Sequence, residues 1–420
     1  MKKYVKNIIC FIGVILSLFY YLNNEYSQIG NTILATYLFC ISLVMCFYIK
    51  ESFELWLLGI FITYFYYGMI ANDYLPNGCR VPFAYYKNVE YYGKGIALLL
   101  LFSSVFFICI SCKYVKTQFS LRNYQRKNTL IVWGLIFAQI FIIIYGFDRT
   151  VSSSYKVHIS TIYEYIYIFI LVSLMFAKDQ KIAEIVILCC SGFAIIQDLY
   201  FGGRITSLQI IIVLIVFYQE KVKRLTWLIG MFGGVIVFSL VGIYRKAYML
   251  TGDFVQNFLD SFFRNRFTLD TTYFAWYATI TDLIAKDVYS NETKISNFIG
   301  FVLNIIGIHA EDYEMVPVLA YKAGYVNVGG SYAFAFFYFW FGIVGVIVGA
   351  LLFGVIIMKI IRSKGALGKI LLCVVVASSP RWILYTPINF FRAPLLCCIL
   401  YGMCNVFDGV INKRKIVLKM

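Results

Sequence analysis

Phe201-Gly202-Gly203-Arg204 joins two apolar segments, 183–199 and 205–218, and places an arginine at their junction. A guanidinium at mid-depth in a bilayer costs roughly 2.5 to 3.5 kcal/mol on insertion scales, so an arginine beside such segments usually has a functional role. Glycine has no Cβ and lets a backbone and a ligand come close together. The stretch therefore indicates membrane helices with a cationic group at the edge of the hydrocarbon.

The composition indicates an integral membrane protein. Hydrophobic residues make up 61% of the 420 residues and charged residues 14%, which is far too apolar for one soluble core. A spanning helix needs about 20 mainly apolar residues. Twelve runs approach that length: about 7–22, 32–49, 53–70, 95–112, 129–147, 161–177, 183–199, 204–219, 225–243, 335–360, 369–386 and 391–410. We therefore expect an all-α polytopic membrane protein with twelve transmembrane helices.

The charges suggest how these helices are oriented. If both termini lie in the cytoplasm, the inner loops and helix ends carry 22 of the 37 basic residues and six of the 21 acidic ones. The inner face then holds the entire net charge of +16, and the outer face, with 15 residues of each sign, is neutral. Lys and Arg gather in short cytoplasmic loops by the positive-inside rule. The basic excess is therefore a topology signal and predicts no nucleic-acid partner.

Arginine and lysine divide unequally between the two faces. Only five of the 22 inner basic residues are arginine, whereas eight of the 15 outer ones are: Arg80, Arg149, Arg204, Arg245, Arg264, Arg266, Arg381 and Arg392. The planar fork of arginine binds phosphate or carboxylate through two hydrogen bonds and stays charged near low dielectric. Each arginine can instead pair with an outer acid. For the set as a whole, we favour an anionic ligand at the outer face.

A long outer segment, 245–333, separates the ninth and tenth spans. Residues 254–263 and 272–285 within it show apolar side chains at helical spacing. Such helices lie along a membrane surface or cap a cavity. We therefore expect one transmembrane domain over residues 1–420, with a loop subdomain at 245–333 that contains short interfacial helices.

Candidate chemistry lies in the outer polar groups. His309, Glu311 and Asp312 bring an imidazole and two carboxylates together just before the tenth span. This cluster can supply a general base whose pKa is set by like-charged neighbours, or it is a solvated acidic loop that pairs with nearby arginines. Arg264 and Arg266 lie between aromatic runs, where they form either a phosphate clamp or part of a surface helix.

Two further arginines follow near the C-terminus. Ser379-Pro380-Arg381-Trp382 interrupts an apolar stretch, and Arg392 begins the next span. A broken helix at membrane depth is tolerated where it faces protein or a cavity, across which these two arginines would face Arg204. The alternative is that the proline merely ends a helix at the outer surface. The candidate anion-binding set is Arg204, Arg245, Arg264, Arg266, Arg381 and Arg392.

The sequence contains no motif for a metal or nucleotide. Cys109-Ile110-Ser111-Cys112 has C-x-x-C spacing but no second ligand pair or histidine nearby. P-loop, dinucleotide-binding and H-E-x-x-H motifs are absent from the sequence. We therefore expect no metal and no cofactor.

These features together resemble the Wzy-type O-antigen or capsule repeat-unit polymerases. The likeness covers nearly the whole chain in topology: twelve spans, cytoplasmic termini and one large outer loop late in the sequence. Local similarities are Gly202-Gly203-Arg204 at the start of a span, Gly329-Gly330-Ser331-Tyr332 running into 341–345, and a late Pro380-Arg381. The sequence departs from the family in two places. Related O-antigen ligases have a histidine near the position of Gly330-Ser331, and the arginine-x10-glycine pattern of some polymerases is not found in either major outer loop.

The resemblance implies a polyprenol-dependent glycosyltransferase in the cytoplasmic (inner) membrane of a bacterium, with its active site facing the periplasm. Its substrates would be oligosaccharides linked to undecaprenyl pyrophosphate, and the growing chain would pass from its lipid to the non-reducing end of a fresh repeat unit. Arginines such as Arg204 would stabilise the departing pyrophosphate, and His309, Glu311 or Asp312 would activate the acceptor hydroxyl. The implied partners are the lipid bilayer and a chain-length regulator.

Two other classes remain open. A flippase for lipid-linked oligosaccharides also has about twelve spans and interior arginines, but such transporters tend to show two similar halves and evenly short loops. The sequence shows no internal repeat, and its one long loop, 245–333, lies on one side only. A membrane ligase or acyltransferase would need a histidine motif near a span end, which His309 matches only loosely.

Overall fold

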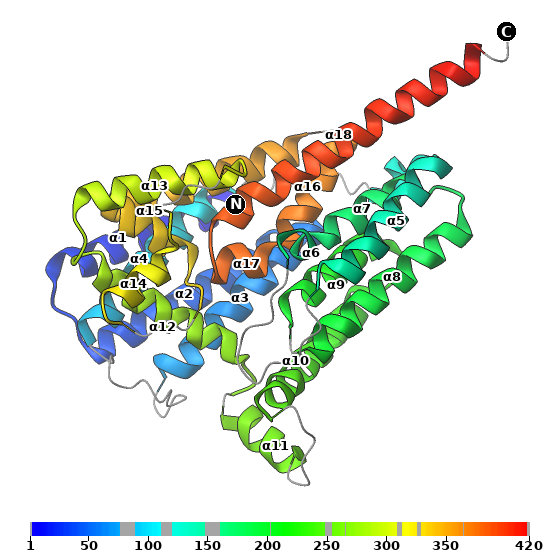
Figure 1. The fold of residues 1–420 in the computed structure, drawn as a ribbon. Helices are drawn as coiled ribbons and strands as arrows, with labels where there is room; N and C mark the ends of the chain where they lie inside the picture. The colour runs from blue at the N-terminus through cyan, green and yellow to red at the C-terminus, as the bar shows by residue number, and fades with distance from the viewer. Residues whose placement is uncertain are drawn as a thin grey trace. The chain divides into compact units, whose positions relative to one another are not determined.

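The computed structural model describes ten stretches of the chain. They are residues 2–75, 89–110, 120–147, 160–201, 203–247, 254–264, 266–308, 313–325, 329–363 and 365–417. Within these stretches the chain is built from α-helices and short 3-10 helices, and the only β-pairing is an isolated bridge between Lys127 and Ala177. The expected all-α class is confirmed (Figure 1).

Eight helices in the described stretches are long and apolar enough to cross a membrane, which supports a multi-pass membrane protein. They are α1 (Lys2–Asn23), α2 (Gln28–Tyr48), α3 (Phe53–Asp73), α4 (Val89–Cys109), α8 (Lys181–Tyr200), α10 (Arg224–Ala247), α15 (Ala333–Arg362) and α18 (Ile388–Val417). Four shorter apolar helices lie within the other four predicted runs: α5 (Thr129–Tyr145), α7 (Ile166–Phe176), α9 (Ile205–Phe217) and α16 (Ala366–Ala377). Twelve spans with cytoplasmic termini stay a prediction.

Several of these helices begin where the sequence offers a polar cap. The side chains of Ser27, Ser52 and Asn128 accept hydrogen bonds from the first-turn N–H groups of α2, α3 and α5. In a hydrocarbon environment such caps replace the water that would otherwise satisfy these donors. The same residues thus mark where each apolar run becomes a helix.

The chain folds into two compact units, each made of separate segments. Unit 1 comprises Met1–Gln118, Val255–Arg362 and Ser379–Phe391. Unit 2 comprises Phe119–Phe254, Ser363–Ser378 and Arg392–Met420. Of the segment 245–333, the residues up to Phe254 belong to unit 2 and those from Val255 on belong to unit 1. The loop subdomain expected at 245–333 stays a prediction.

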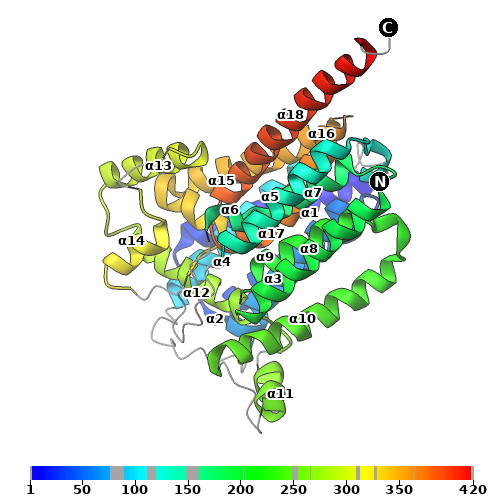
Figure 2. The same cartoon turned by 45° about the vertical axis from the view of Figure 1, so that its right-hand side comes forward.

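Unit 1 is organised around α4. This helix packs against α1, α2 and α15, and fifteen of its residues are buried. The segment after α10 adds α11 (Phe254–Arg264), α12 (Asp270–Ala285), α13 (Asn291–Ile305) and α14 (Val316–Lys322). In Figures 1 and 2, α14 lies beside α12 and α13 lies beside α15, in agreement with their contacts.

The two helices predicted in the long segment are confirmed, but only one fits the expected surface position. Val255, Leu259 and Phe263 of α11 are exposed and lie on one face of that helix, as in a helix that rests on a membrane surface. Twelve of the residues of α12 are instead buried, and the helix packs against α3, α4, α14, α15 and α17 (Ser379–Leu384). The interfacial position expected for residues 272–285 is therefore wrong. Their aromatic and small side chains are enclosed by other helices.

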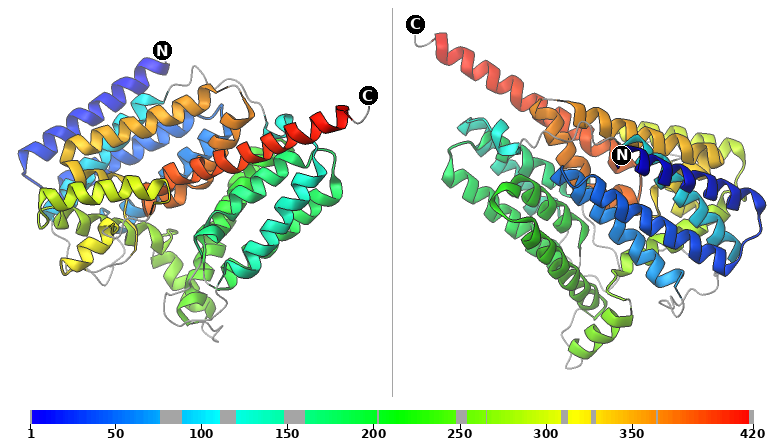
Figure 3. Two further views of the ribbon diagram at one scale, coloured as in Figure 1. Left: turned by 45° about the horizontal axis from the view of Figure 1, so that its top comes forward. Right: turned by 180° about the vertical axis from the view of Figure 1, so that it is seen from behind.

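Unit 2 is a helical bundle in which α7 packs against α5, α8 and α9, and α9 packs against α8 and α16. Figure 3 shows the green helices of this unit running alongside one another from two further sides. α6 (Thr161–Glu164) precedes α7, and the 3-10 helices η3 (Leu121–Tyr124) and η4 (Gln219–Lys221) connect other elements. The link between α8 and α9 contains Arg204, and it is the part of this unit with the most unusual chemistry.

Candidate functional site

Arg204 lies at the junction of α8 and α9, immediately before the first helical residue of α9. Its side chain is half-buried, and its Nη1 atom donates a hydrogen bond of 3.4 Å to the carbonyl oxygen of Phe238 in α10. A guanidinium keeps its charge in such surroundings because its pKa is above 12. Three helices of unit 2 thus fix a permanent positive charge at the end of an apolar bundle.

Asp198 holds this junction together from the last turn of α8. Its side chain is buried, and its Oδ2 atom accepts hydrogen bonds from the backbone N–H of Ser207 at 2.9 Å and from the Ser207 hydroxyl at 2.8 Å. The N–H of Gly203 bonds to the Asp198 carbonyl oxygen at 2.7 Å. A negative charge near a helix N-terminus is favourable, so Asp198 stabilises the start of α9.

At Gly203 the backbone comes close to another group, as expected for a glycine at this junction. A Cβ at that position would collide with the carboxylate of Asp198, so the absence of a side chain lets the chain fold over this acid. The close neighbour is therefore a residue of the protein itself. Gly202 lies outside the described residues.

Asp198 was not among the residues selected from the sequence, although a signal was present. It is the acidic residue at the outer end of the apolar run 183–199, and a carboxylate in such a run is as costly as an arginine. The insertion cost that marks Arg204 in the sequence thus marks Asp198 as well.

In unit 1, two motifs of the resemblance come together. A Cβ at Gly330 would collide with the backbone of Tyr385, which follows α17, and the Ser331 N–H bonds to the Tyr385 carbonyl oxygen at 3.3 Å. Tyr332 begins the approach to α15, and its N–H donates to the Thr279 hydroxyl of α12 at 2.9 Å. The glycine-rich link is thus packed against Tyr385, the residue that follows α17 and its Pro380-Arg381 pair.

Asp282 of α12 is the buried acid of this junction. The hydroxyl of Ser331 donates to its Oδ2 atom at 2.5 Å, while its Oδ1 atom is buried without a hydrogen-bond partner among the described residues. Burial raises the pKa of Asp282 well above the usual aspartate range, and the Ser331 hydrogen bond opposes this shift only in part. Asp282 therefore favours its neutral, protonated form.

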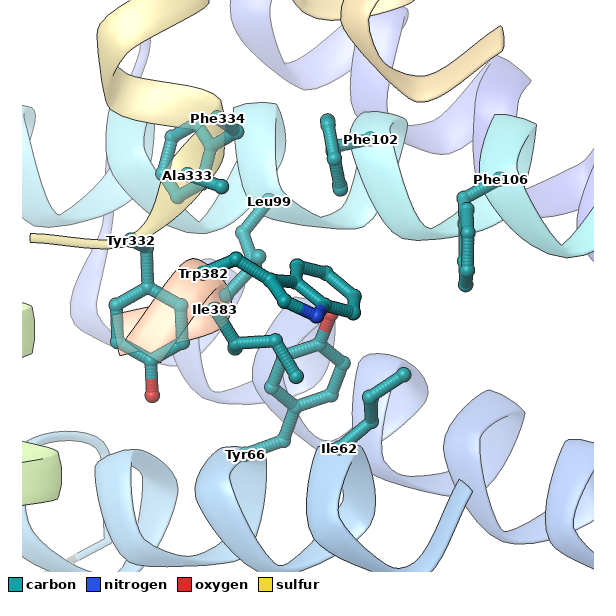
Figure 4. A pocket seen from close by; sticks show the side chains of 10 residues that line it. All are labelled: Ile62, Tyr66, Leu99, Phe102, Phe106, Tyr332, Ala333, Phe334, Trp382 and Ile383. Atoms are coloured by element: carbon teal, nitrogen blue, oxygen red, sulfur yellow. The ribbon is translucent and has the colours of Figure 1, made fainter. Parts of the chain in front are cut away.

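A small cavity lies beside this junction (Figure 4). Its volume is about 20 Å³, and it is lined by Ile62, Tyr66, Leu99, Phe102, Phe106, Tyr332, Ala333, Phe334, Trp382 and Ile383. Such a volume holds about one water molecule. The Tyr66 hydroxyl is already paired with Ser103 at 2.6 Å. The cavity is therefore a feature of aromatic packing, too small to hold a sugar or a lipid.

A larger and more polar cavity lies where the ends of α2, α3 and α4 meet. Its volume is about 130 Å³, and it is lined by Gln28, Asn31, Thr32, Asp73, Tyr74, Val89 and Tyr92. That is about ten times the volume needed for one water, and comparable with the dozen heavy atoms of a hexose. Hydrogen bonds from Asn31 to the Val89 carbonyl at 3.0 Å and from Thr32 to the Tyr74 carbonyl at 3.0 Å fix its walls. Amide, hydroxyl and carboxylate groups suit the hydroxyls of a sugar.

The arginines selected from the sequence divide between the two units. Arg204 and Arg392 belong to unit 2, and Arg264, Arg266 and Arg381 belong to unit 1. The meeting of Arg204, Arg381 and Arg392 around one anion therefore stays a prediction.

Arg266 has a clear role in the fold. Its Nη1 atom donates to the carbonyl oxygen of Ala71 at 3.1 Å, in the last turn of α3, where helix carbonyls lack partners within the helix. Its own carbonyl oxygen accepts from the Tyr67 hydroxyl at 2.9 Å. Arg266 thus caps α3 and joins it to the turn before α12. Arg264, at the end of α11, is exposed, and Arg381 in α17 is half-buried.

The other selected positions lie partly outside the described residues. His309, Glu311 and Asp312 fall there, so the role of this cluster as a source of the general base stays a prediction. The backbone of Arg245 belongs to α10, but its side chain is also outside the described part.

Comparison of the chain with protein-family models, with curated proteins and with solved structures gives no significant match. The likeness to the Wzy-type polymerases therefore rests on topology and short motifs alone. The function has to be argued from the chemistry of the site.

Proposed function

We propose that this protein is a glycosyltransferase that polymerises oligosaccharide repeat units carried on undecaprenyl pyrophosphate, at the outer face of a bacterial cytoplasmic membrane. The product would be a surface polysaccharide, an O-antigen or a capsule. The observation that carries the proposal is Arg204, a permanent charge held half-buried at the junction of two apolar helices. Such a group suits the pyrophosphate of a lipid whose tail lies in the bilayer.

The proposed reaction needs a fixed cation more than it needs a metal. The bond between the anomeric carbon of the growing chain and its pyrophosphate oxygen breaks, and that carbon bonds to a hydroxyl oxygen of the acceptor sugar. The hydroxyl proton passes to a base, for which His309, Glu311 and Asp312 are the candidates from the sequence. Negative charge develops on the departing pyrophosphate, and preorganised arginines such as Arg204 stabilise it.

The polar cavity of unit 1 supports the sugar-binding half of the proposal. The Asp73 carboxylate at the wall of this cavity can accept a hydrogen bond from a sugar hydroxyl, and Gln28 can both donate and accept. Tyr74 and Tyr92 offer aromatic surface beside these groups. We infer that this cavity holds one sugar of a substrate.

A gel analysis of surface polysaccharide after deletion of the gene tests this function. A polymerase mutant should still display one repeat unit on its acceptor but no long chains. Loss of every repeat unit would favour the flippase, because a transporter must act before any unit reaches the outer face. Chains of normal length in the deletion strain would contradict both functions.

A further inference from the structure

Two lysines of unit 1 lie beside the same aromatic ring. The Nζ atom of Lys94 in α4 is 5.9 Å from the centre of the Tyr338 ring, and the Nζ atom of Lys286 is 4.9 Å from it. The two ammonium groups are therefore at most 10.8 Å apart, the sum of these two distances. The face of this one ring attracts both ammonium groups.

Aromatic side chains fix the position of Lys94. Its ammonium group also lies 6.0 Å from the ring centre of Tyr21 and 5.9 Å from that of Tyr91. The hydroxyls of Tyr21 and Tyr338 are joined by a hydrogen bond of 3.1 Å, which holds two of the three rings together. Lys94 is thus oriented by tyrosines and, among the described residues, forms no ion pair with an acid.

Lys286 reaches the same place from the end of α12. Its side chain is 23% exposed, and its Cε atom lies 3.9 Å from the position that a Cβ of Gly342 would occupy. Gly342 has a φ of 61°, a conformation that favours glycine, and interrupts α15 beside the lysine stem. On α13, burial and the Lys286 charge lower the pKa of the half-buried Lys294, and Asp287 opposes this shift.

The acids around this cluster do not neutralise it. Lys286 pairs with Asp287 at 3.7 Å, but Asp287 is 55% exposed, and such surface pairs contribute little. Among the described residues, a further carboxylate close to Tyr91 is Glu90, which is exposed. Asp287 and Glu90 are both solvated, so water screens their charges from Lys94 and Lys286.

We propose that Lys94 and Lys286 form a second anion site, which holds the pyrophosphate of a lipid-linked substrate. The proposal rests on the polymerase function, which requires two such substrates at once. One pyrophosphate departs during the reaction, whereas the acceptor keeps its own. Lysine is a compact point charge and suits a pyrophosphate that is only held in place, while the arginine fork of unit 2 suits the one that leaves.

Counting bound lipid tests both sites separately. The purified full-length protein is saturated with undecaprenyl pyrophosphate and analysed by native mass spectrometry. The wild-type chain should hold two molecules, and the Lys94→Gln/Lys286→Gln variant should hold one, with binding at the lost site weakened roughly ten- to a hundredfold per ammonium removed. Lys94→Arg/Lys286→Arg keeps both charges and should retain two molecules. Lys322→Gln, which removes an exposed lysine paired with Glu314, is the matched control and should also retain two.

The outcomes separate this proposal from the one on Arg204. If Arg204→Ala holds two molecules and the lysine double variant holds one, the pyrophosphate role of Arg204 fails and the lysine site stands. If the lysine double variant still holds as many molecules as the wild type, the lysine site is overturned. Inorganic pyrophosphate in excess should displace the lipid from this site. Displacement by phosphatidylglycerol would overturn the proposal, because an ordinary headgroup phosphate would then be the ligand.

Discussion

The Oδ2 atom of Asp198 accepts both the backbone N–H and the hydroxyl of Ser207, at 2.9 and 2.8 Å. One buried carboxylate thereby joins the end of α8 to the first turn of α9, with Arg204 between them. Hydrogen bonds to a charged group are worth about 1.5 to 3 kcal/mol each. The backbone on either side of Arg204 is thus held in place by the Asp198 carboxylate.

Gly203→Ala should destabilise unit 2. The new methyl group would collide with Asp198, and overpacking of this kind costs about 1 to 3 kcal/mol. Gly192→Ala is the matched control, because a Cβ at Gly192 of α8 has no neighbour within 4 Å. Thermal unfolding of the two purified variants in detergent measures the difference. Equal melting temperatures would show that the Asp198 contact does not constrain the junction.

Arg204→Ala should abolish long polysaccharide chains while the protein stays in the membrane. Loss of one such transition-state contact costs about 2.7 to 4 kcal/mol, or roughly a hundred- to a thousandfold in rate. Arg204→Lys should restore only part of the chain length, since a point charge does not reproduce the fork. A gel of surface polysaccharide and an immunoblot of the membranes measure both quantities. Arg362→Ala removes an arginine on the predicted cytoplasmic face and serves as the control. Wild-type chain lengths from Arg204→Ala would contradict the role proposed for this residue.

Asp73→Asn should shorten the polysaccharide chains or lower their amount. The substitution keeps the shape of the cavity wall but removes the negative charge that would strengthen a hydrogen bond from a sugar hydroxyl. A fall of roughly tenfold in polymerisation rate corresponds to one charge-assisted hydrogen bond. Asp260→Asn removes an exposed carboxylate of the same unit, which bonds to Gln256 in α11, and should leave chain length unchanged. If both variants behave alike, the cavity does not bind the sugar.

The stability of the protein should fall as pH rises through the range in which Asp282 ionises. Burial raises its pKa in the folded state above the unfolded value of about 3.9. The contribution of the protonated acid is therefore complete below that unfolded pKa and is lost as pH rises through the folded pKa. Asp282→Asn keeps an acceptor for Ser331 and cannot ionise. The melting temperatures of the wild type and the variant are compared at pH 5 and at pH 8. The melting temperature of the variant relative to the wild type should be higher at pH 8 than at pH 5. An equal difference between the two proteins at both pH values would contradict a raised pKa.

Part of this structure follows from the sequence in a direct way. Apolar runs long enough for a bilayer predicted helices at all twelve positions where the structure has long or short apolar helices, because helical hydrogen bonding is obligatory in hydrocarbon. The helical spacing of 254–263 also predicted α11. Its exposed apolar face matches the expected surface helix.

Other features depend on contacts that no local pattern contains. Thr279, Thr281 and Asp282 give α12 a polar appearance, yet all three are buried by helices that lie far away in the sequence. The pairing of Gly330 with Tyr385 and of Lys94 with Lys286 likewise joins residues more than 50 positions apart. Hydrophobic periodicity describes one helix at a time, so it could not predict which helix would cover α12 or which lysines would share a ring.

The division of unit 1 into three segments has a consequence for biosynthesis. α12 packs against α3 and α4, which are made before it, and also against α15 and α17, which are made after it. The ribosome must pass Leu384, the last residue of α17, before this enclosure can be completed. Until then the threonines and the aspartate of α12 are not fully covered, although α5 to α10 have already been synthesised. A nascent chain that is stopped before α17 should therefore expose α12 to cellular proteases. A chain that is extended beyond Leu384 should protect α12 from them.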